Sequence, residues 1–286
     1  MLAALVNGVI VGAGYALVAL GIVLIYKATR QFNFAQGEFG TVATFVAWML
    51  LERDIPWPIS GLIAILTGIA LALVVERVVV RPLQNSPKVT VLVATLGVAL
   101  LLISLQIIIG EAKLRGIDPM VSGDGFSIGG ASVQPQDLMI ILGLAVTGGV
   151  LFLFFRSSYG TALLATSQEA FAARIAGIST NQMAMLTWGL AGLFGALAGL
   201  LFAPLGAFTP GFMTQVRLIP GFTAAVLGGI TSLPGAVVGG FTIGLIESFS
   251  GHLLGEQIRG ADGLGVFIAL LAVLVVRPKG LLGKEA

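Results

Sequence analysis

Apolar stretches of membrane-spanning or near-spanning length recur along this whole chain. They lie at about 2–26, 34–51, 57–76, 89–109, 137–155, 183–203, 218–232, 235–250 and 263–276. A helix needs about 20 consecutive apolar residues to cross the hydrocarbon core of a bilayer. Only 10% of the residues are charged, whereas soluble domains average about 25%. The sequence therefore predicts an all-α fold, a polytopic transmembrane helical bundle formed as one domain over residues 1–286.

The number of spans depends on the two glycine-rich runs at 218–232 and 235–250. Both are short, so they form either two thin spans or one re-entrant pair buried in protein, giving eight or nine membrane segments. The paired glycines Gly228–Gly229 and Gly239–Gly240 allow helix backbones to cross closely. Broken helices of this kind often line substrate routes in transporters, and tight packing alone explains the glycines equally well.

The Lys and Arg residues predict how the chain is oriented, because cytoplasmic connections carry an excess of them. With the N-terminus outside, the inner connections hold Lys27, Arg30, Arg77, Arg81, Lys88, Arg156, Arg174, Arg277, Lys279 and Lys284, and the outer ones hold Arg53, Lys113, Arg115, Arg217 and Arg259. This choice makes the C-terminus cytoplasmic. The net charge of +2 reflects this topology and not binding to nucleic acid. In the outer loop 111–136, alternation at Phe126–Ile128 predicts a small hairpin or a loop.

A polar, helix-forming segment at 157–182 interrupts the apolar chain on the inner side. Thr166 and Glu169 have capping-box spacing, which predicts a helix from about Ser167 to Ala176 that ends at Gly177. Ten residues form a rod of roughly 15 Å, too short to cross a bilayer. The helix either contacts a partner or lies flat on the lipid headgroups.

The sequence contains few groups that could carry chemistry. It has no cysteine, only one histidine, and no phosphate-binding loop of the G-x-x-x-x-G-K-[ST] type. Enzyme activity, a metal site and nucleotide hydrolysis within this chain are therefore not expected. Glu38, beside Asn33 and Gly37, is an ionisable group within an apolar run. Such a group either lines a pathway or makes a structural contact, for example by capping a helix or pairing with a basic residue.

Several motifs together resemble branched-chain amino acid ABC transporter permeases, and the type they resemble is the H subunit of the leucine/isoleucine/valine system. The motifs are GYALVALG at 14–21, LIY at 24–26, NFAQGEF at 33–39, Ser158-Tyr159-Gly160, Glu169-Ala170 with Ala173, Ala176-Gly177-Ile178, AAVLGG at 224–229 with Gly235-Ala236 and Gly239-Gly240, and RPKGLLG at 277–283. They occur in family order and cover nearly the whole chain.

The resemblance implies a permease domain that works in a heteromeric complex of a prokaryotic cytoplasmic (inner) membrane. Its expected partners are two cytoplasmic ATPase subunits that bind ATP and Mg, an external substrate-binding protein and a second homologous permease subunit. Pairing with a second copy of this chain is the alternative that the resemblance favours less. The segment at 157–182 becomes a cytoplasmic coupling loop. Its candidate ATPase contacts are Thr166, Glu169, Ala170, Phe171, Arg174 and Gly177. The candidate pathway or packing residues are Asn33, Gly37, Glu38, Gly228, Gly229, Gly239 and Gly240.

The resemblance predicts import of branched-chain or related amino acids. Members of the broader family are expected to carry urea, short amides or other small solutes, so these remain alternatives. A different class, an ATP-independent secondary transporter, would use Glu38 and Glu247 as ion-coupling groups.

Overall fold

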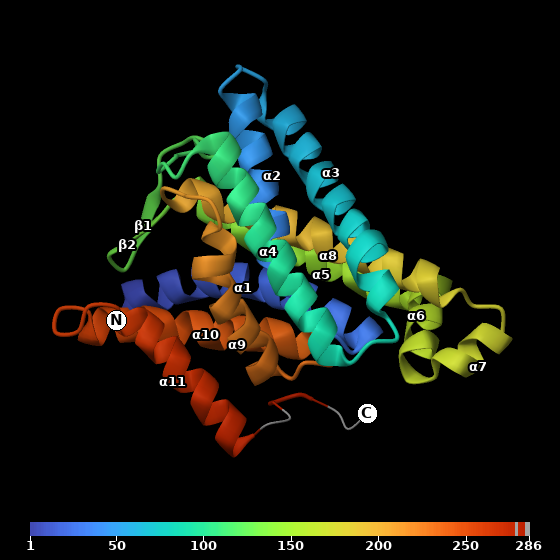
Figure 1. Cartoon of the computed structure of the whole chain (residues 1–286). Coiled ribbons are helices and arrows are strands. Elements are labelled where there is room, and N and C mark those ends of the chain that lie inside the picture. Colours follow the sequence, from blue (N-terminus) through green and yellow to red (C-terminus); the bar gives the residue numbers. More distant parts are fainter. Residues whose placement is uncertain (278–279, 284–286) are drawn as a thin grey trace.

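The computed structural model is a bundle of helices with one small β-hairpin (Figure 1). It describes residues 1–277 and 280–283, so Pro278 and Lys279 of the C-terminal motif and residues 284–286 lie outside it. The elements are α1 (Leu2–Thr29), α2 (Gln36–Leu51), α3 (Trp57–Val75), α4 (Lys88–Gly110), β1 (Phe126–Ile128), β2 (Ala131–Val133), α5 (Pro135–Arg156), α6 (Ser158–Gln168), α7 (Ala170–Ile175), α8 (Thr180–Phe202), α9 (Leu218–Gly228), α10 (Leu233–Leu254) and α11 (Ala261–Val276).

Six of the described helices are long and apolar enough to cross a membrane. They are Leu2–Thr29, Trp57–Leu83, Lys88–Gly110, Pro135–Arg156, Thr180–Leu205 and Leu233–Leu254. The helices α2 and α11, with 16 residues each, are shorter. A helical membrane bundle is therefore the fold, as the sequence predicts.

The two glycine-rich runs form helices of different lengths. The run at 235–250 belongs to α10, which has 22 residues. In the run at 218–232 only the 11 residues of α9 are α-helical, and a π-helical turn, Met213–Arg217, leads into them. At 1.5 Å per residue, α9 is about 16 Å long, which is too short to span a bilayer alone.

The first helix occupies the centre of the bundle. In the most apolar 18-residue stretch of α1, 89% of the residues are buried. The helix packs against α10, α8, α9 and α5. Gly8 and Gly12 of α1 face the backbone of α10, and Gly240 and Gly244 of α10 face the backbone of α1. A methyl group at any of these positions would collide with the opposing helix. Small residues allow this close approach, which strengthens dispersion contacts where no hydrophobic effect drives association.

The remaining spans form two groups around α1. α2, α3 and α8 pack against one another, while α9, α10 and α11 form a second group. Figure 1 shows α2 and α3 above α1, α9 and α10, while α4 runs down from the level of α2 to that of α10. Of the two alternatives for the outer segment, a hairpin or a loop, the structure has the hairpin: β1 and β2 pair antiparallel, with Phe126 opposite Val133.

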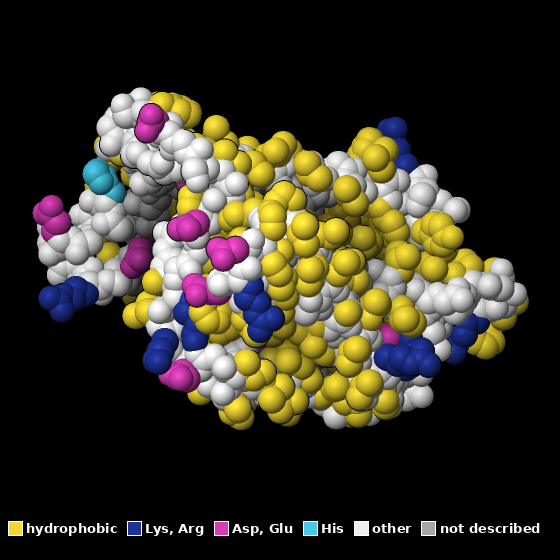
Figure 2. Space-filling model, turned by 90° about the horizontal axis from the view of Figure 1, so that it is seen from above, with side chains coloured by type: hydrophobic (Ala, Val, Ile, Leu, Met, Phe, Trp, Pro, Cys, Tyr) yellow, Lys and Arg dark blue, Asp and Glu magenta, His cyan; other side chains and the backbone are white. Residues whose placement is uncertain are grey.

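Polar side chains gather at the two ends of the bundle and an apolar band separates them. Figure 2 shows acidic and basic side chains together with His252, the single histidine, at the end that carries the N-terminus. Mainly Lys and Arg are visible at the opposite end, where Figure 1 places α6 and α7. This pattern is that of a protein whose apolar middle lies in lipid.

Candidate functional site

A buried polar network surrounds Glu38 in the first turn of α2. The Glu38 side chain is fully buried, and its Oε2 accepts a 2.6 Å hydrogen bond from Nε2 of Gln106 in α4. Oε1 of Gln106 in turn accepts the backbone N–H of Gly211 at 3.1 Å. The network therefore joins α2, α4 and the segment that leads into α9.

The neighbouring residues of α2 tighten the same junction. The backbone N–H of Met213 donates to Oγ1 of Thr41 at 3.3 Å, and a methyl group at Gly37 would collide with Thr214. Asn33 shapes the entry to α2, because its Oδ1 accepts the backbone N–H of Ala35 at 3.0 Å. Glu38 forms no ion pair with any described basic residue. Its hydrogen-bond partner is the side-chain amide of Gln106. The pairing of Glu38 with a basic residue, which the sequence left open, does not occur among the described residues.

A second polar contact joins the π-helical turn to α1. The guanidinium of Arg217 donates a 3.1 Å hydrogen bond to the hydroxyl of Tyr15, and it lies 4.5 Å from the centroid of the Phe202 ring. The sequence places Arg217 in an outer connection, whereas the structure places it in the helical turn that begins α9. Aromatic faces attract a guanidinium, which explains how a cation is accommodated among these helices.

The paired glycines lie where α9, α10 and α1 meet. A methyl group at Gly228 would overlap the carbonyl of Gly235, and one at Gly239 would overlap the carbonyl of Ala224. Gly240 instead faces Ala16 of α1. Gly229 ends α9 with a φ of 104°, a conformation that side chains rarely adopt. The backbone crossing therefore leaves no room for side chains.

The polar segment at 157–182 forms two short helices at the end of the bundle. In α7 the side chains of Phe171 and Ile175 are 66% and 74% exposed. Ala170 and Arg174 are also exposed, and the Arg174 Nε donates to the carbonyl of Ala170 within the same helix. An apolar, unpartnered tip therefore projects from the bundle at α7 (Figure 1).

The expected capping box at Thr166 is wrong. The hydroxyl of Ser157 already caps α6 by accepting the Gly160 N–H, so Thr166 lies inside that helix and donates to the carbonyl of Leu163. Glu169 is itself the cap of the second helix, with its Oε1 accepting the Phe171 N–H. The second helix consequently begins at Ala170, and not at Ser167.

The helix ends near the position that the sequence indicates. Gly177 has a φ of 81°, and its N–H donates to the Arg174 carbonyl, while the Ile178 N–H donates to the Ala173 carbonyl. These bonds satisfy carbonyls that the end of the helix would otherwise leave unpaired.

Sequence reasoning missed Gln106 and the pairing of Tyr15 with Arg217. The signal for Gln106 was its amide within an otherwise apolar run, since a polar side chain in lipid needs a partner.

Among residues 1–277 and 280–283, no group of three or more His, Asp or Glu side chains is placed to hold a metal ion.

Comparison with known proteins gives matches over nearly the full chain. The family described as branched-chain amino acid transport system / permease component matches residues 4–276. The permease protein BraD of a high-affinity branched-chain amino acid transport system in Pseudomonas aeruginosa is 31% identical, over 98% of this chain and 95% of BraD. The corresponding LivH of Escherichia coli K12 is 30% identical, over 97% of this chain and 94% of LivH.

A solved structure supports the fold. PsaBC from Streptococcus pneumoniae, in complex with Fab, superposes with a TM-score of 0.52 at 17% identity, over 96% of this chain and 89% of that one. The matches to the family and to BraD span essentially the same residues as the bundle. The chain therefore belongs to the family of permease components of branched-chain amino acid transport systems.

Proposed function

We propose that this chain is the pathway-forming permease subunit of an ATP-driven importer for branched-chain or related amino acids. Its location is the cytoplasmic membrane of a prokaryote, with the N-terminus outside and the C-terminus inside. The family match over 4–276 and the relatives BraD and LivH support this role. ATP and Mg bind to partner subunits in this scheme, and the permease itself performs no catalysis.

The exposed apolar tip of α7 is the observation that carries the proposal. The side chains of Phe171 and Ile175 are mostly exposed to water. Burying one such side chain against a partner would stabilise the contact by about 1.5–3 kcal/mol. A groove on one of the two ATPase subunits would cover this tip in the assembled importer. In that arrangement α7 transmits nucleotide-driven movement to the bundle, with Glu169 and Gly177 fixing its two ends.

The helical segment 213–228 is the best candidate for the pathway surface. Its inner face contacts Gly37 and Tyr15, while Val216 and Ile219 on the opposite face are 55% and 54% exposed. A second permease subunit facing this surface would enclose a route between the two chains. An external binding protein would deliver the solute to its outer end and contribute most of the selectivity.

Purification from native membranes tests the proposal directly. The full chain is isolated in mild detergent, and co-purifying proteins are identified by mass spectrometry. Two ATPase subunits and a second permease are expected, with uptake of leucine, isoleucine or valine in proteoliposomes that requires ATP and the binding protein. Solute movement by this chain alone, without ATP, would contradict the proposal and direct attention to Glu38 and Glu247 as ion-coupling groups.

A further inference from the structure

A cavity of about 1070 Å³ opens between α1, α5, α6 and α10. It lies where α1 and α5 end, at the same end of the bundle as α7. Three cationic side chains line it, those of Lys27, Arg30 and Arg156, and no acidic side chain is among its described lining residues. The described lining of the cavity is therefore positively charged, at one edge of the apolar band.

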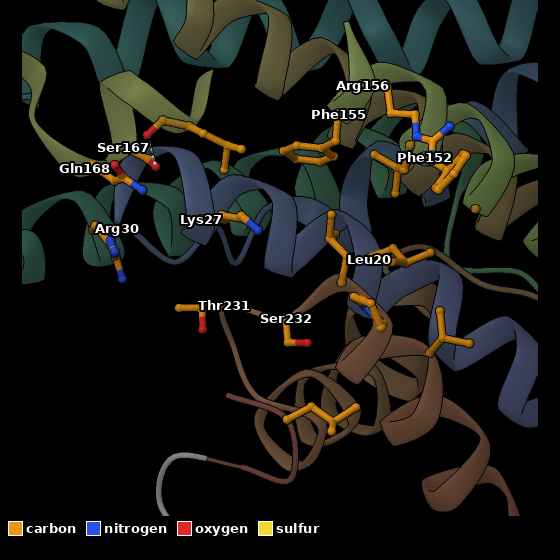
Figure 3. Close-up of a pocket in the computed structure, with 17 residues that line it drawn as sticks. Leu20, Lys27, Arg30, Phe152, Phe155, Arg156, Ser167, Gln168, Thr231 and Ser232 are labelled. Atoms are coloured by element: carbon orange, nitrogen blue, oxygen red, sulfur yellow. Dashed lines mark hydrogen bonds between the residues drawn. The ribbon is translucent and has the colours of Figure 1, made fainter. Parts of the chain in front are cut away.

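The three cations have no acidic partner in the described part of the chain. The Lys27 ammonium lies 5.2 Å from the centroid of the Phe155 ring, and the Arg156 guanidinium lies 4.4 Å from that of Phe152. Aromatic faces orient these groups but do not neutralise them. Figure 3 shows Lys27 and Arg30 on one side of the cavity, with Thr231 and Ser232 across from them.

Arg30 occupies an unusual backbone position. It follows the last turn of α1 with φ 55° and ψ 26°, and its N–H donates to the Tyr26 carbonyl at 2.8 Å. This left-handed conformation suits glycine or asparagine much better than arginine. The backbone conformation at position 30 would favour glycine or asparagine. Arginine differs from both by its long, positively charged side chain, which lines the cavity.

The rest of the lining is apolar. Leu20 and Leu151 are buried beneath the cations, and Leu164, Leu233 and Val237 extend the apolar wall. The Thr231 and Ser232 side chains add polar groups at the opposite rim. A small hydrated anion would match the cations but would leave this wall uncovered. A ligand with an anionic head and hydrocarbon chains matches both parts.

We propose that this cavity binds one anionic phospholipid of the surrounding leaflet. Its phosphate lies at Lys27 and Arg30, where the guanidinium group forms charge-assisted hydrogen bonds, and Arg156 adds a third positive charge farther along the cavity. Its acyl chains follow the apolar wall of α1, α5 and α10. Basic pockets between membrane helices suit anionic headgroups in this way. The site requires only that α1 and α5 end at the membrane surface, whatever solute is transported.

A lipid titration of the delipidated, full-length protein tests the site. Native mass spectrometry counts bound phosphatidylglycerol and, in parallel, zwitterionic phosphatidylcholine. The double substitution Lys27→Gln/Arg30→Asn removes two charges, and asparagine tolerates the left-handed backbone of position 30. Retention of phosphatidylglycerol should fall by about tenfold or more in this variant. Arg77→Gln is the matched control, because Arg77 is exposed and lies outside the cavity.

A thiol probe measures occupancy in the intact protein. The chain has no cysteine, so Ser167→Cys places a single thiol in the cavity lining. Phosphatidylglycerol should slow its alkylation, and phosphatidylcholine should not. Equal binding of both lipids would overturn the proposal, as would undiminished binding by the double variant or an equal loss in Arg77→Gln. Protection by soluble glycerol phosphate as strong as that by the lipid would assign the site to a free anion instead.

Discussion

The side-chain amide of Gln106 in α4 lies 2.6 Å from the carboxylate of Glu38 in α2, and the two residues are 68 positions apart in the chain. The same amide group accepts the backbone N–H of Gly211 through its oxygen. One glutamine therefore connects two packed helices to the irregular segment before α9. This connection makes Glu38 a positioning residue for the proposed pathway helix.

Replacing Glu38 with alanine should lower stability. The Nε2 group of Gln106 would lose its acceptor in a buried site, and an unsatisfied buried donor costs about 1–3 kcal/mol. Thermal unfolding of the purified protein in detergent measures the effect. Glu38→Gln is the control, since its amide oxygen can still accept this bond, and both stability and ATP-dependent uptake should remain near wild type. Loss of uptake in Glu38→Gln at unchanged stability would instead indicate that the carboxylate charge is needed.

Phe171→Asp should uncouple transport from ATP hydrolysis. A carboxylate at the apolar tip of α7 would have to lose its hydration on docking, which disfavours contact with an ATPase subunit. Uptake in proteoliposomes should fall by at least about tenfold, which corresponds to about 1.4 kcal/mol in the activation free energy of transport. The thermal unfolding of the isolated permease should stay unchanged. Ser158→Asp adds the same charge at the exposed start of α6 and should transport normally. Unimpaired uptake by Phe171→Asp would exclude α7 as the docking element.

Gly228→Ala should disrupt the crossing of α9 and α10. The added methyl group overlaps the Gly235 carbonyl, and overpacking of this kind typically costs about 1–3 kcal/mol. The yield of monodisperse protein in detergent and its unfolding temperature provide the readout. Gly97→Ala is the matched control, because a methyl group there meets open space and alanine favours a helix by about 1 kcal/mol. Equal stability of the two variants would show that the crossing tolerates a wider separation.

Tyr15→Phe should destabilise the junction between α1 and the π-helical turn. It removes the hydroxyl that accepts the Arg217 hydrogen bond, and hydrogen bonds to charged groups contribute about 1.5–3 kcal/mol. Tyr26→Phe removes a hydroxyl from the same helix that makes no hydrogen bond within the described residues, so it should have little effect. A smaller unfolding shift for Tyr15→Phe than for Tyr26→Phe, measured in the same detergent, would refute the assigned contact.

Local patterns in the sequence predict local structure well. The alternation at Phe126–Ile128 indicates a hairpin or a loop, of which the hairpin forms, and the glycine at 177 predicts the end of α7, because both depend on neighbouring residues. Thr166 shows the limit of such patterns. Its capping-box spacing is real, but Thr166 lies inside a helix that starts at Ser158, so its hydroxyl donates to a carbonyl of the preceding turn.

The polar contacts inside the bundle lay beyond prediction from the sequence. Gln106 is far in sequence from Glu38, and Arg217 is 202 positions from Tyr15. Their pairing depends on how the helices pack, which hydrophobic periodicity does not specify when all faces of a helix are apolar. Because Arg217 is charged, the sequence predicts that it lies in an outer connection. In the structure its guanidinium instead contacts the Tyr15 hydroxyl and the Phe202 ring.

The central position of α1 has a consequence for biosynthesis. α1 is translated long before α10, yet the glycine-rich face around Gly12 is covered by α10, which begins at Leu233. At about 5–20 residues per second of translation, roughly 10–50 s pass before that partner is made. During this interval lipid or an insertion factor must shield the face of α1. Nascent chains stalled before Leu233 would contain several of the apolar helices and still expose this face of α1.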